Sequence, residues 1–186
     1  KVIMLGALVV LVLSGCSIGF NTGSGANVGA TDGGVFKSSN KGTNWEQKVL
    51  VQTVGARRSI GSWDIISLML DPADNKAIYA GSLENGLAYS YDGGEGWQVA
   101  VSLGKVNVNN VAVDPANKCV IYATAANKVY KSTDCSRTWS VVYFDNDPKA
   151  IVSSLVIDFS NSNNVYIGTS RGEIIKSSDR AGSWKT

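Results

Sequence analysis

The chain has 186 residues, of which 44% are hydrophobic, and its 17 Lys and Arg residues against 15 Asp and Glu give a formal net charge of +2. This small charge provides no field for binding nucleic acid, and Arg57-Arg58 is the only adjacent pair of arginines. The absence of histidine removes the commonest transition-metal ligand and the commonest general base near neutral pH. We therefore expect no metal site, no cofactor and no nucleic-acid partner.

The N-terminus predicts export. Lys1 precedes an apolar run from Val2 to Leu13 that is too short to span a bilayer, and Leu-Ser-Gly-Cys follows at 13–16. This tetrapeptide resembles the bacterial lipobox, which implies a signal peptide at 1–15, acylation of Cys16 and a lipid-anchored protein of the bacterial envelope, at the outer membrane in a Gram-negative host, facing the periplasm or the exterior. Residues 16–26, rich in Gly, Ser and Asn, read as a flexible tether. The alternative is an ordinary secretory signal with an incidental cysteine.

From residue 27 to residue 186 the chain repeats. Four eight-residue stretches open on serine and close on tryptophan, and all are variants of S-x-D-x-G-x-x-W. The four tryptophans are 52, 42 and 45 residues apart, a period typical of one β-propeller blade rather than of a helical solenoid. The recurring residues are Ser38, Asn40, Gly42, Trp45; Ser90, Asp92, Gly94, Trp97; Ser132, Asp134, Trp139; and Ser177, Asp179, Trp184.

These stretches resemble the Asp-box, or BNR repeat, of sialidases, sortilin-type receptors, Asp-box glycoside hydrolases and photosystem II assembly-factor propellers. The resemblance implies that each box is the turn between the third and fourth strands of a blade. In such a turn the Asp or Asn side chain accepts backbone hydrogen bonds, Gly supplies a positive φ, and Trp fills the gap between sheets. Because Ser136 and Ala181 occupy the glycine position of the last two boxes, we expect those turns to be strained or differently shaped.

Two further series recur beside the boxes. Asp71, Asp114 and Asp158 each end an apolar segment, and Tyr-containing segments begin at residues 78, 121 and 165. Each unit is thus predicted to form four short antiparallel strands. The predicted fold is all-β, a propeller with about four Asp-box blades. The first unit lacks its innermost strand and the last unit most of its outermost strand, so we expect a part of a six- to eight-bladed propeller, or closure by association.

The cysteines Cys119 and Cys135 are predicted to be neighbours. If Ala126-Asn127 form a hairpin turn, the residue numbers of two directly opposed residues add up to about 254. The numbers 119 and 135 meet this condition, so the two cysteines would lie opposite each other. In an oxidising compartment such a pair forms a disulfide. The alternative is that both thiols are free and half-buried.

Residues that recur in every unit are expected to build the blades, so we interpret the repeated aspartates as turn formers and the four box tryptophans as core residues. No catalytic residue is predicted. Residues that break the repeat are better candidates for binding, and they fall in two loops: Arg57, Arg58, Trp63 and Asp64 in the first, and Tyr143, Asp145 and Asp147 in the second.

The first loop combines an aromatic ring, two guanidiniums and a carboxylate, as binding hot spots do. The alternative is that Trp63 packs beneath its own loop while the arginines are solvated. Because each loop precedes an innermost strand, both are expected at the end of the propeller opposite the boxes, where they would line one mouth of the central channel.

Two classes of function compete. The first is a non-catalytic, envelope-anchored propeller that binds a protein or a glycan or helps to assemble an envelope complex, with the membrane reached only through the lipid anchor. The second is a fragment of an Asp-box glycoside hydrolase. The segment GLAYSYDGGEGW closely resembles a turn of hydrolases that act on xyloglucan. These enzymes use two carboxylates across a cleft. Asp64 and Asp147 are the only such pair that the sequence offers.

Overall fold

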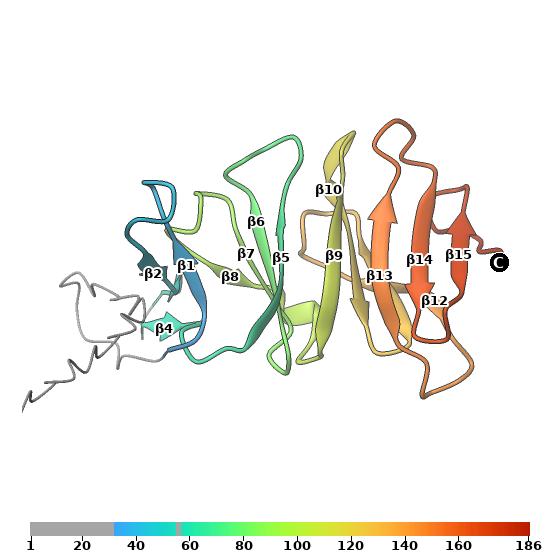
Figure 1. Ribbon diagram of the computed structural model, residues 1–186, viewed down its shortest axis with the longest axis horizontal. Coiled ribbons are helices and arrows are strands. Elements are labelled where there is room, and N and C mark those ends of the chain that lie inside the picture. Colours follow the sequence, from blue (N-terminus) through green and yellow to red (C-terminus); the bar gives the residue numbers. More distant parts are fainter. Residues whose placement is uncertain (1–31, 55–56) are drawn as a thin grey trace, which may run out of the picture.

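The computed structural model describes residues 32–54 and 57–186, and in this part the secondary structure is β apart from one short 3-10 helix. The strands form antiparallel sheets that follow one another along the chain in a row (Figure 1). We call the four repeat units blades 1 to 4. The predicted signal peptide, Cys16 and the tether lie outside the described residues.

Blades 2 and 3 are complete four-stranded sheets whose strands pair in sequence order. Each sheet begins with the strand that leads to the repeated aspartate and finishes with the strand that follows a box. Blade 2 contains β5 (Ile65–Leu70), β6 (Ile78–Ser82), β7 (Leu87–Ser90) and β8 (Gln98–Val99), and η1 (Val101–Leu103) follows it. Blade 3 contains β9 (Val108–Asp114), β10 (Asn117–Ala125), β11 (Lys128–Ser132) and β12 (Ser140–Phe144).

The outer two blades are smaller. Blade 4 has three strands and one further bridge, Lys176 with Lys185, where a fourth strand begins. In blade 1 one pair of strands flanks the box, and a second two-stranded sheet follows. The strands are β13 (Val152–Ile157), β14 (Val165–Thr169) and β15 (Ile174–Ser177) in blade 4, and β1 (Val35–Lys37), β2 (Glu46–Lys48), β3 (Leu50–Val51) and β4 (Arg58–Ser59) in blade 1.

The blades pack face to face. The first strands β5, β9 and β13 lie beside one another and are in contact (Figure 1). Three clusters of buried side chains fill the junctions, each combining residues from neighbouring blades, so the core is a series of inter-blade layers rather than one central mass. Such packing of small antiparallel sheets is that of a β-propeller, as predicted.

The four boxes share one hydrogen-bonding pattern. In the second box Ser90 Oγ accepts from the Gly94 N–H at 2.9 Å, and Asp92 Oδ1 accepts from the Gly96 N–H at 2.8 Å. The same pairs recur in the other three boxes at 2.8–3.0 Å. These polar side chains therefore satisfy the backbone of their own turn, where a tight reversal leaves N–H groups without strand partners.

The third and fourth boxes were expected to be strained or differently shaped, and the second of these alternatives is wrong. Ser136 and Ala181 stand at φ of 68° and 70°, in the same left-handed region as Gly94 at 90°, and the hydrogen bonds of the turn are preserved. The serine and aspartate side chains hold the backbone in this conformation even without glycine. What remains of the expectation is strain, because a residue with a Cβ is less stable there than glycine.

The box tryptophans join neighbouring blades. Trp97 is fully buried, and its indole N–H donates to the Lys48 carbonyl of blade 1 at 2.8 Å. Trp184 donates in the same way to Val142 of blade 3 at 2.9 Å. Each acceptor is the third residue after the tryptophan of the preceding box. The indole therefore both fills the junction and fixes its register.

The junction between blades 2 and 3 departs from this pattern. The Trp139 indole N–H has no hydrogen-bond partner in the described structure. The equivalent acceptor, the carbonyl of Ala100, receives the Leu103 N–H instead at 3.0 Å. The short strand β8 thus turns directly into η1, and this turn removes the carbonyl that the indole would otherwise bind.

Trp45 corrects the expectation that all four box tryptophans are core residues. Its side chain is 40% exposed, and its indole N–H donates to Gly42 of its own box at 3.1 Å. The physical reason is that no blade precedes blade 1 in the described residues, so the ring has no neighbouring sheet to contact.

A disulfide joins Cys119 and Cys135 in the structure, with their Cα atoms 3.9 Å apart. The Ala126-Asn127 turn pairs Ala125 with Lys128, so the opposed residues of this hairpin sum to 253 rather than 254. The Cys135 N–H donates to the Cys119 carbonyl at 3.2 Å. The bridge therefore ties the start of β10 to the third box.

Candidate functional site

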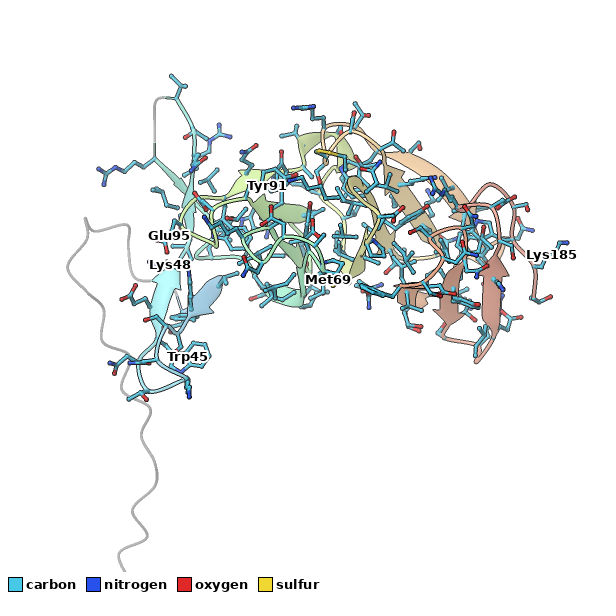
Figure 2. All side chains as sticks on the ribbon, turned by 90° about the horizontal axis from the view of Figure 1, so that it is seen from above. Trp45, Lys48, Met69, Tyr91, Glu95 and Lys185 are labelled. Carbon is cyan, nitrogen blue, oxygen red and sulfur yellow. A yellow bond between two sulfur atoms is a disulfide. The ribbon has the colours of Figure 1, made fainter. Side chains whose placement is uncertain are left out.

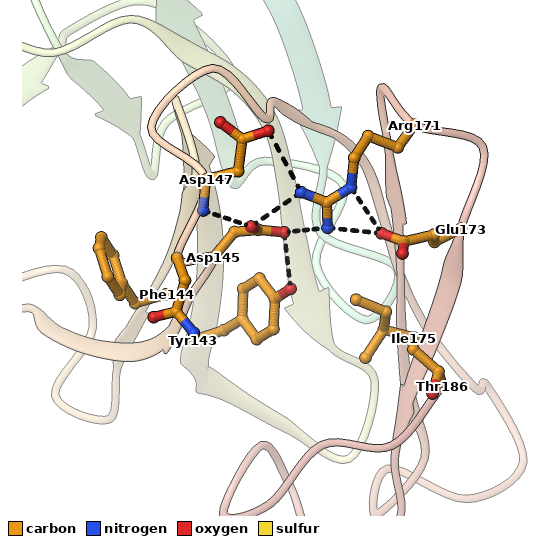
Figure 3. A pocket seen from close by; sticks show the side chains of 9 residues that line it. Tyr143, Phe144, Asp145, Asp147, Arg171, Glu173, Ile175 and Thr186 are labelled. Carbon is orange, nitrogen blue, oxygen red and sulfur yellow. Dashed lines mark hydrogen bonds and ion pairs between the residues drawn. The ribbon is translucent and has the colours of Figure 1, made fainter.

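A pocket of about 420 Å³ opens between blades 3 and 4, at the end of the sheets away from the boxes (Figure 3). One wall is the loop that leaves β12, and the other is the turn between β14 and β15. Four charged side chains gather there: three carboxylates and one guanidinium. The lining residues are Tyr143, Phe144, Asp145, Asn146, Asp147, Arg171, Glu173, Ile175 and Thr186.

Arg171 organises the pocket. Its Nη1 and Nη2 donate to the two oxygens of Asp145 at 3.0 and 2.7 Å, in a bidentate pair (Figure 3). Nε and Nη2 also donate to Glu173 Oε2 at 3.1 and 2.7 Å, and Asp147 lies 3.7 Å from Nη1. A planar guanidinium is suited to this arrangement because its N–H groups diverge in one plane.

The structure holds Asp145 firmly. Its side chain is buried, the Asp147 N–H donates to Oδ1 at 2.9 Å, and the Tyr143 hydroxyl donates to Oδ2 at 3.3 Å. Its backbone N–H and carbonyl are both bound to Asn127, in the β10–β11 turn. The hydrogen bonds from Arg171, above all, lower the pKa of the Asp145 carboxyl. The same pairing raises the pKa of the Arg171 guanidinium.

These contacts limit what the pocket can do chemically. Asp145 is kept ionised, and both its oxygens are occupied, so it is a poor general acid and a poor nucleophile. Asp147 is exposed; its Oδ1 accepts the Lys149 N–H at 2.9 Å, and its Oδ2, which lies 3.7 Å from Arg171, is left open to a ligand. Beside it the Phe144 ring is 54% exposed, with Lys128 Nζ 5.7 Å from its centroid. Fixed acceptors next to an open aromatic face suit a ligand with hydroxyl groups and an apolar surface.

The first candidate loop lies elsewhere. Arg57, Arg58 and Asp64 are exposed, and none of the described residues of that loop lines the pocket. Trp63 is half-buried against the core cluster of blades 1 and 2, its N–H donates to the Ile60 carbonyl at 3.0 Å, and its carbonyl accepts from Gly34. Of the two interpretations of Trp63, the structure therefore agrees with the one in which the ring packs beneath its own loop.

The two candidate loops do emerge at the same end of the sheets, opposite the boxes (Figure 1). Blades 2 and 3 both lie between them in the row, so Asp64 and Asp147 belong to different junctions. Tyr143, Asp145 and Asp147, in contrast, share one pocket.

The sequence reasoning missed Arg171 and Glu173. A signal was present: the β14–β15 turn reads TSRGE, whereas the corresponding segment of blade 2 reads SLENG. A guanidinium and a carboxylate on either side of Gly172 break the repeat in a hairpin turn. That turn belongs to the same end of the blades as the irregular loop after β12.

Two absences concern the described residues alone. Residues 32–54 and 57–186 contain no group of three or more His, Cys, Asp or Glu side chains arranged to hold a metal ion. No helix in that part of the chain is long and apolar enough to cross a membrane.

Comparison with known proteins gives similarity to xyloglucanases and to several solved structures. No protein-family profile matches the chain. A xyloglucanase from Paenibacillus sp. is 28% identical over 193 residues, which cover 82% of this chain and 18% of that protein. The structure of an ancestral GH74 enzyme aligns with a TM-score of 0.65 at 24% identity, covering 83% of this chain and 21% of that one.

YCF48 from Cyanidioschyzon merolae aligns with a TM-score of 0.55 at 16% identity over 66% of this chain and 36% of that one, and YCF48 has also been solved bound to D1 peptide. These likenesses show the β-propeller fold, of which this chain supplies a part. The chain spans about a fifth of the length of the xyloglucanase.

Proposed function

We propose that this part of the chain is a non-catalytic binding segment of a β-propeller at the bacterial envelope, and that its ligand is a polysaccharide. The observation that carries the proposal is the engagement of Asp145 and Glu173 by Arg171, at 2.7 Å in each case. A carboxylate paired in this way is a fixed hydrogen-bond acceptor rather than a proton donor. The pocket thus has the polar groups of a sugar site without an evident acid catalyst.

The choice of a glycan rests on two further supports. The exposed Phe144 ring lies beside the acceptors of the pocket, so a sugar ring can contact it while its hydroxyls reach Asp147. The xyloglucanase from Paenibacillus sp., whose name states that it acts on a glycan, is 28% identical to this chain. Acylation of Cys16 would place the segment at the envelope, with the membrane reached only through the lipid.

The test measures retention of the protein in native gels that contain dissolved polysaccharides, xyloglucan among them. We expect xyloglucan or a related β-glucan to retard the protein, and Phe144→Ala to weaken the binding roughly threefold to tenfold through loss of the ring contact. The matched control is Phe159→Ala, because Phe159 is also exposed but lies in the turn after β13, on the other end of the sheets. Equal mobility of the wild-type protein in every gel would contradict the proposal.

The second candidate is a fragment of an Asp-box glycoside hydrolase, which the identity with the xyloglucanase favours. It predicts that the chain releases reducing ends from xyloglucan and that Asp147→Asn and Asp64→Asn each abolish this release. The binding proposal predicts no release by the wild-type chain. A polypeptide ligand is a third outcome, in which envelope proteins but no glycan are retained and Trp63→Ala combined with Arg57→Ala reduces the recovery.

A further inference from the structure

Arg171 is the only cation among the residues that line the pocket, and its donors are nearly all in use. Nε and Nη2 donate to Glu173, and Nη1 and Nη2 donate to the two oxygens of Asp145, at 2.7–3.1 Å. A guanidinium has five N–H groups, so one N–H remains, on Nη1. Nη1 lies 3.7 Å from Asp147 Oδ2, so this last donor also has a carboxylate as its neighbour. A ligand carboxylate therefore finds no free pair of donors on Arg171.

Asp145 keeps the guanidinium from turning towards a ligand. The Asp145 side chain is 6% exposed, and both its oxygens accept hydrogen bonds from Arg171. If the guanidinium moved to a ligand carboxylate, the buried charge of Asp145 would lose its partner, which is strongly destabilising. Arg171 therefore belongs to the wall of the pocket, where it holds two carboxylates in place, and it does not serve as a binding group for an anion.

Two carboxylate oxygens of the pocket are left open. Asp147 Oδ1 accepts the Lys149 N–H at 2.9 Å, whereas Oδ2 accepts no hydrogen bond within the described residues. Glu173 Oε2 accepts from Arg171 and, at 3.2 Å, from the Thr169 hydroxyl, whereas Oε1 accepts none in the same part of the chain. The two acidic side chains are 46% and 40% exposed. The charged side chains thus offer a ligand acceptors rather than donors.

The net charge of the pocket acts in the same direction. Three carboxylates against one guanidinium give a charge of −2 among the lining residues, although the whole chain carries +2. Lys128 is not part of the lining, and its ammonium lies over the Phe144 ring, 5.7 Å from the centroid. An anionic ligand in the pocket is therefore repelled by the excess of carboxylates, since like charges a few ångströms apart interact unfavourably even near the protein surface.

We infer that the pocket binds neutral sugar units and rejects sugars that carry a carboxylate, and that Asp147 sets this preference. A hydroxyl both donates and accepts, so it can donate to Asp147 Oδ2 while it accepts from the remaining Nη1 N–H. A carboxylate only accepts, and in the same place it would oppose the charge of Asp147. This inference rests on the proposed glycan function, to which it adds the class of sugar.

The test compares two soluble polymers with the same β-glucan backbone: hydroxyethyl cellulose, which is neutral, and carboxymethyl cellulose, which is anionic. Native gels that contain increasing amounts of each polymer give the relative affinities of the full chain. We expect carboxymethyl cellulose to bind about tenfold or more weakly at low salt, although a chain of net charge +2 attracts a polyanion overall. Added salt should narrow the difference, because it screens exposed charges.

Asp147→Asn is the variant that tests the residue itself. The amide keeps an oxygen for the Lys149 N–H and replaces the open carboxylate oxygen by a donor. Binding of carboxymethyl cellulose should therefore strengthen about threefold or more, whereas binding of hydroxyethyl cellulose should change by less than that.

The matched control is Asp74→Asn, in the turn after β5. Asp74 Oδ1 accepts the Lys76 N–H at 3.1 Å, so the two variants remove one charge from the same kind of turn. Figure 2 shows Met69, on the strand before this turn, well apart along the row from Lys185, in blade 4. An effect of net charge alone would appear equally in both variants.

The outcomes separate this inference from the proposed function. Stronger retardation by hydroxyethyl cellulose than by carboxymethyl cellulose supports both. Equal retardation by the two polymers, or stronger retardation by the anionic one, leaves glycan binding in place and overturns the inference. An Asp147→Asn variant that binds carboxymethyl cellulose no better than Asp74→Asn also overturns it. If neither cellulose nor xyloglucan retards the protein, the glycan function fails, and the inference fails with it.

Discussion

The two ends of the blades use aspartate in different ways. At the box end, Asp92, Asp134 and Asp179 bind N–H groups within their own turn, four residues along the chain. At the opposite end, Asp145 binds Arg171, which lies 26 residues away in another blade. The first arrangement is repeated and builds each hairpin; the second occurs in one junction and shapes a pocket.

Lowered carboxyl pKa values occur at both ends, so they do not by themselves identify the functional site. In the third box, hydrogen bonds from the hydroxyl and the backbone N–H of Thr138 lower the pKa of Asp134 to about 2. Between blades 3 and 4, the guanidinium of Arg171 lowers the pKa of Asp145. The difference that matters is the origin of the donor. A carboxylate bound by its own turn is structural, while one bound across a junction beside open space is a candidate for recognition.

The sharpest test of the repeated architecture compares two box tryptophans. Trp97→Ala should lower the free energy of unfolding by about 3–5 kcal/mol, because it empties a fully buried junction. Trp45→Ala should cost less than about 1 kcal/mol, because that ring is 40% exposed. Urea titrations followed by circular dichroism measure both. If both variants lowered the free energy of unfolding by the same amount, the two rings would contribute equally to stability, and the comparison would fail.

The aspartates of the turns should make stability depend on acid. Hydrogen bonds lower the pKa of Asp134, in the third box, and of Asp158, in the turn after β13, to about 2 from an ordinary value of 3.8. Because the folded-state pKa lies below the unfolded one, this stabilisation is complete above about pH 5 and is lost as the pH falls towards 2. The urea midpoint should therefore stay level near neutral pH and decline steadily below about pH 5.

A matched pair of variants isolates this contribution. Asn40 already accepts the Asn44 N–H in the first box, at 2.8 Å, so Asp134→Asn should keep the turn but flatten the acid decline. Asn40→Asp should make the decline steeper. If the urea midpoints of the two variants have the same pH dependence as that of the wild type, the carboxylates of the boxes do not make this contribution, and Asp158 remains as its source.

The repeat allowed most of the fold to be predicted, because its signals are local. The spacing of the tryptophans and the alternation before Asp71, Asp114 and Asp158 fix strands and turns within each unit. The exposure of Trp45 was not predictable in the same way. It depends on whether a neighbouring sheet covers the ring, and the eight residues of the box carry no information about that neighbour.

The candidate site was only half predictable for a related reason. Tyr143, Asp145 and Asp147 interrupt the repeat in one loop, so the sequence alone identified them. Arg171 is distant in the chain, and only the packing of blade 4 on blade 3 brings its guanidinium to Asp145. Trp63 shows the converse: an interruption of the repeat that the structure uses for packing.

The smallest of these effects tests how the boxes tolerate residues other than glycine. Ser136 has a φ of 68°, and its buried hydroxyl has no hydrogen-bond partner in the described structure. Ser136→Gly should therefore raise the free energy of unfolding by about 1 kcal/mol, by relieving the left-handed strain.

The reverse change in the second box is the control for this prediction. A Cβ at Gly94 would meet nothing closer than 3.8 Å, so Gly94→Ala changes the backbone preference with little steric cost and should lower stability by about 1 kcal/mol. Both values come from urea titrations at neutral pH. If Ser136→Gly were destabilising instead, the serine would be stabilising the third box through a contact other than the left-handed turn, and the boxes would not be equivalent in their energetics although they share one geometry.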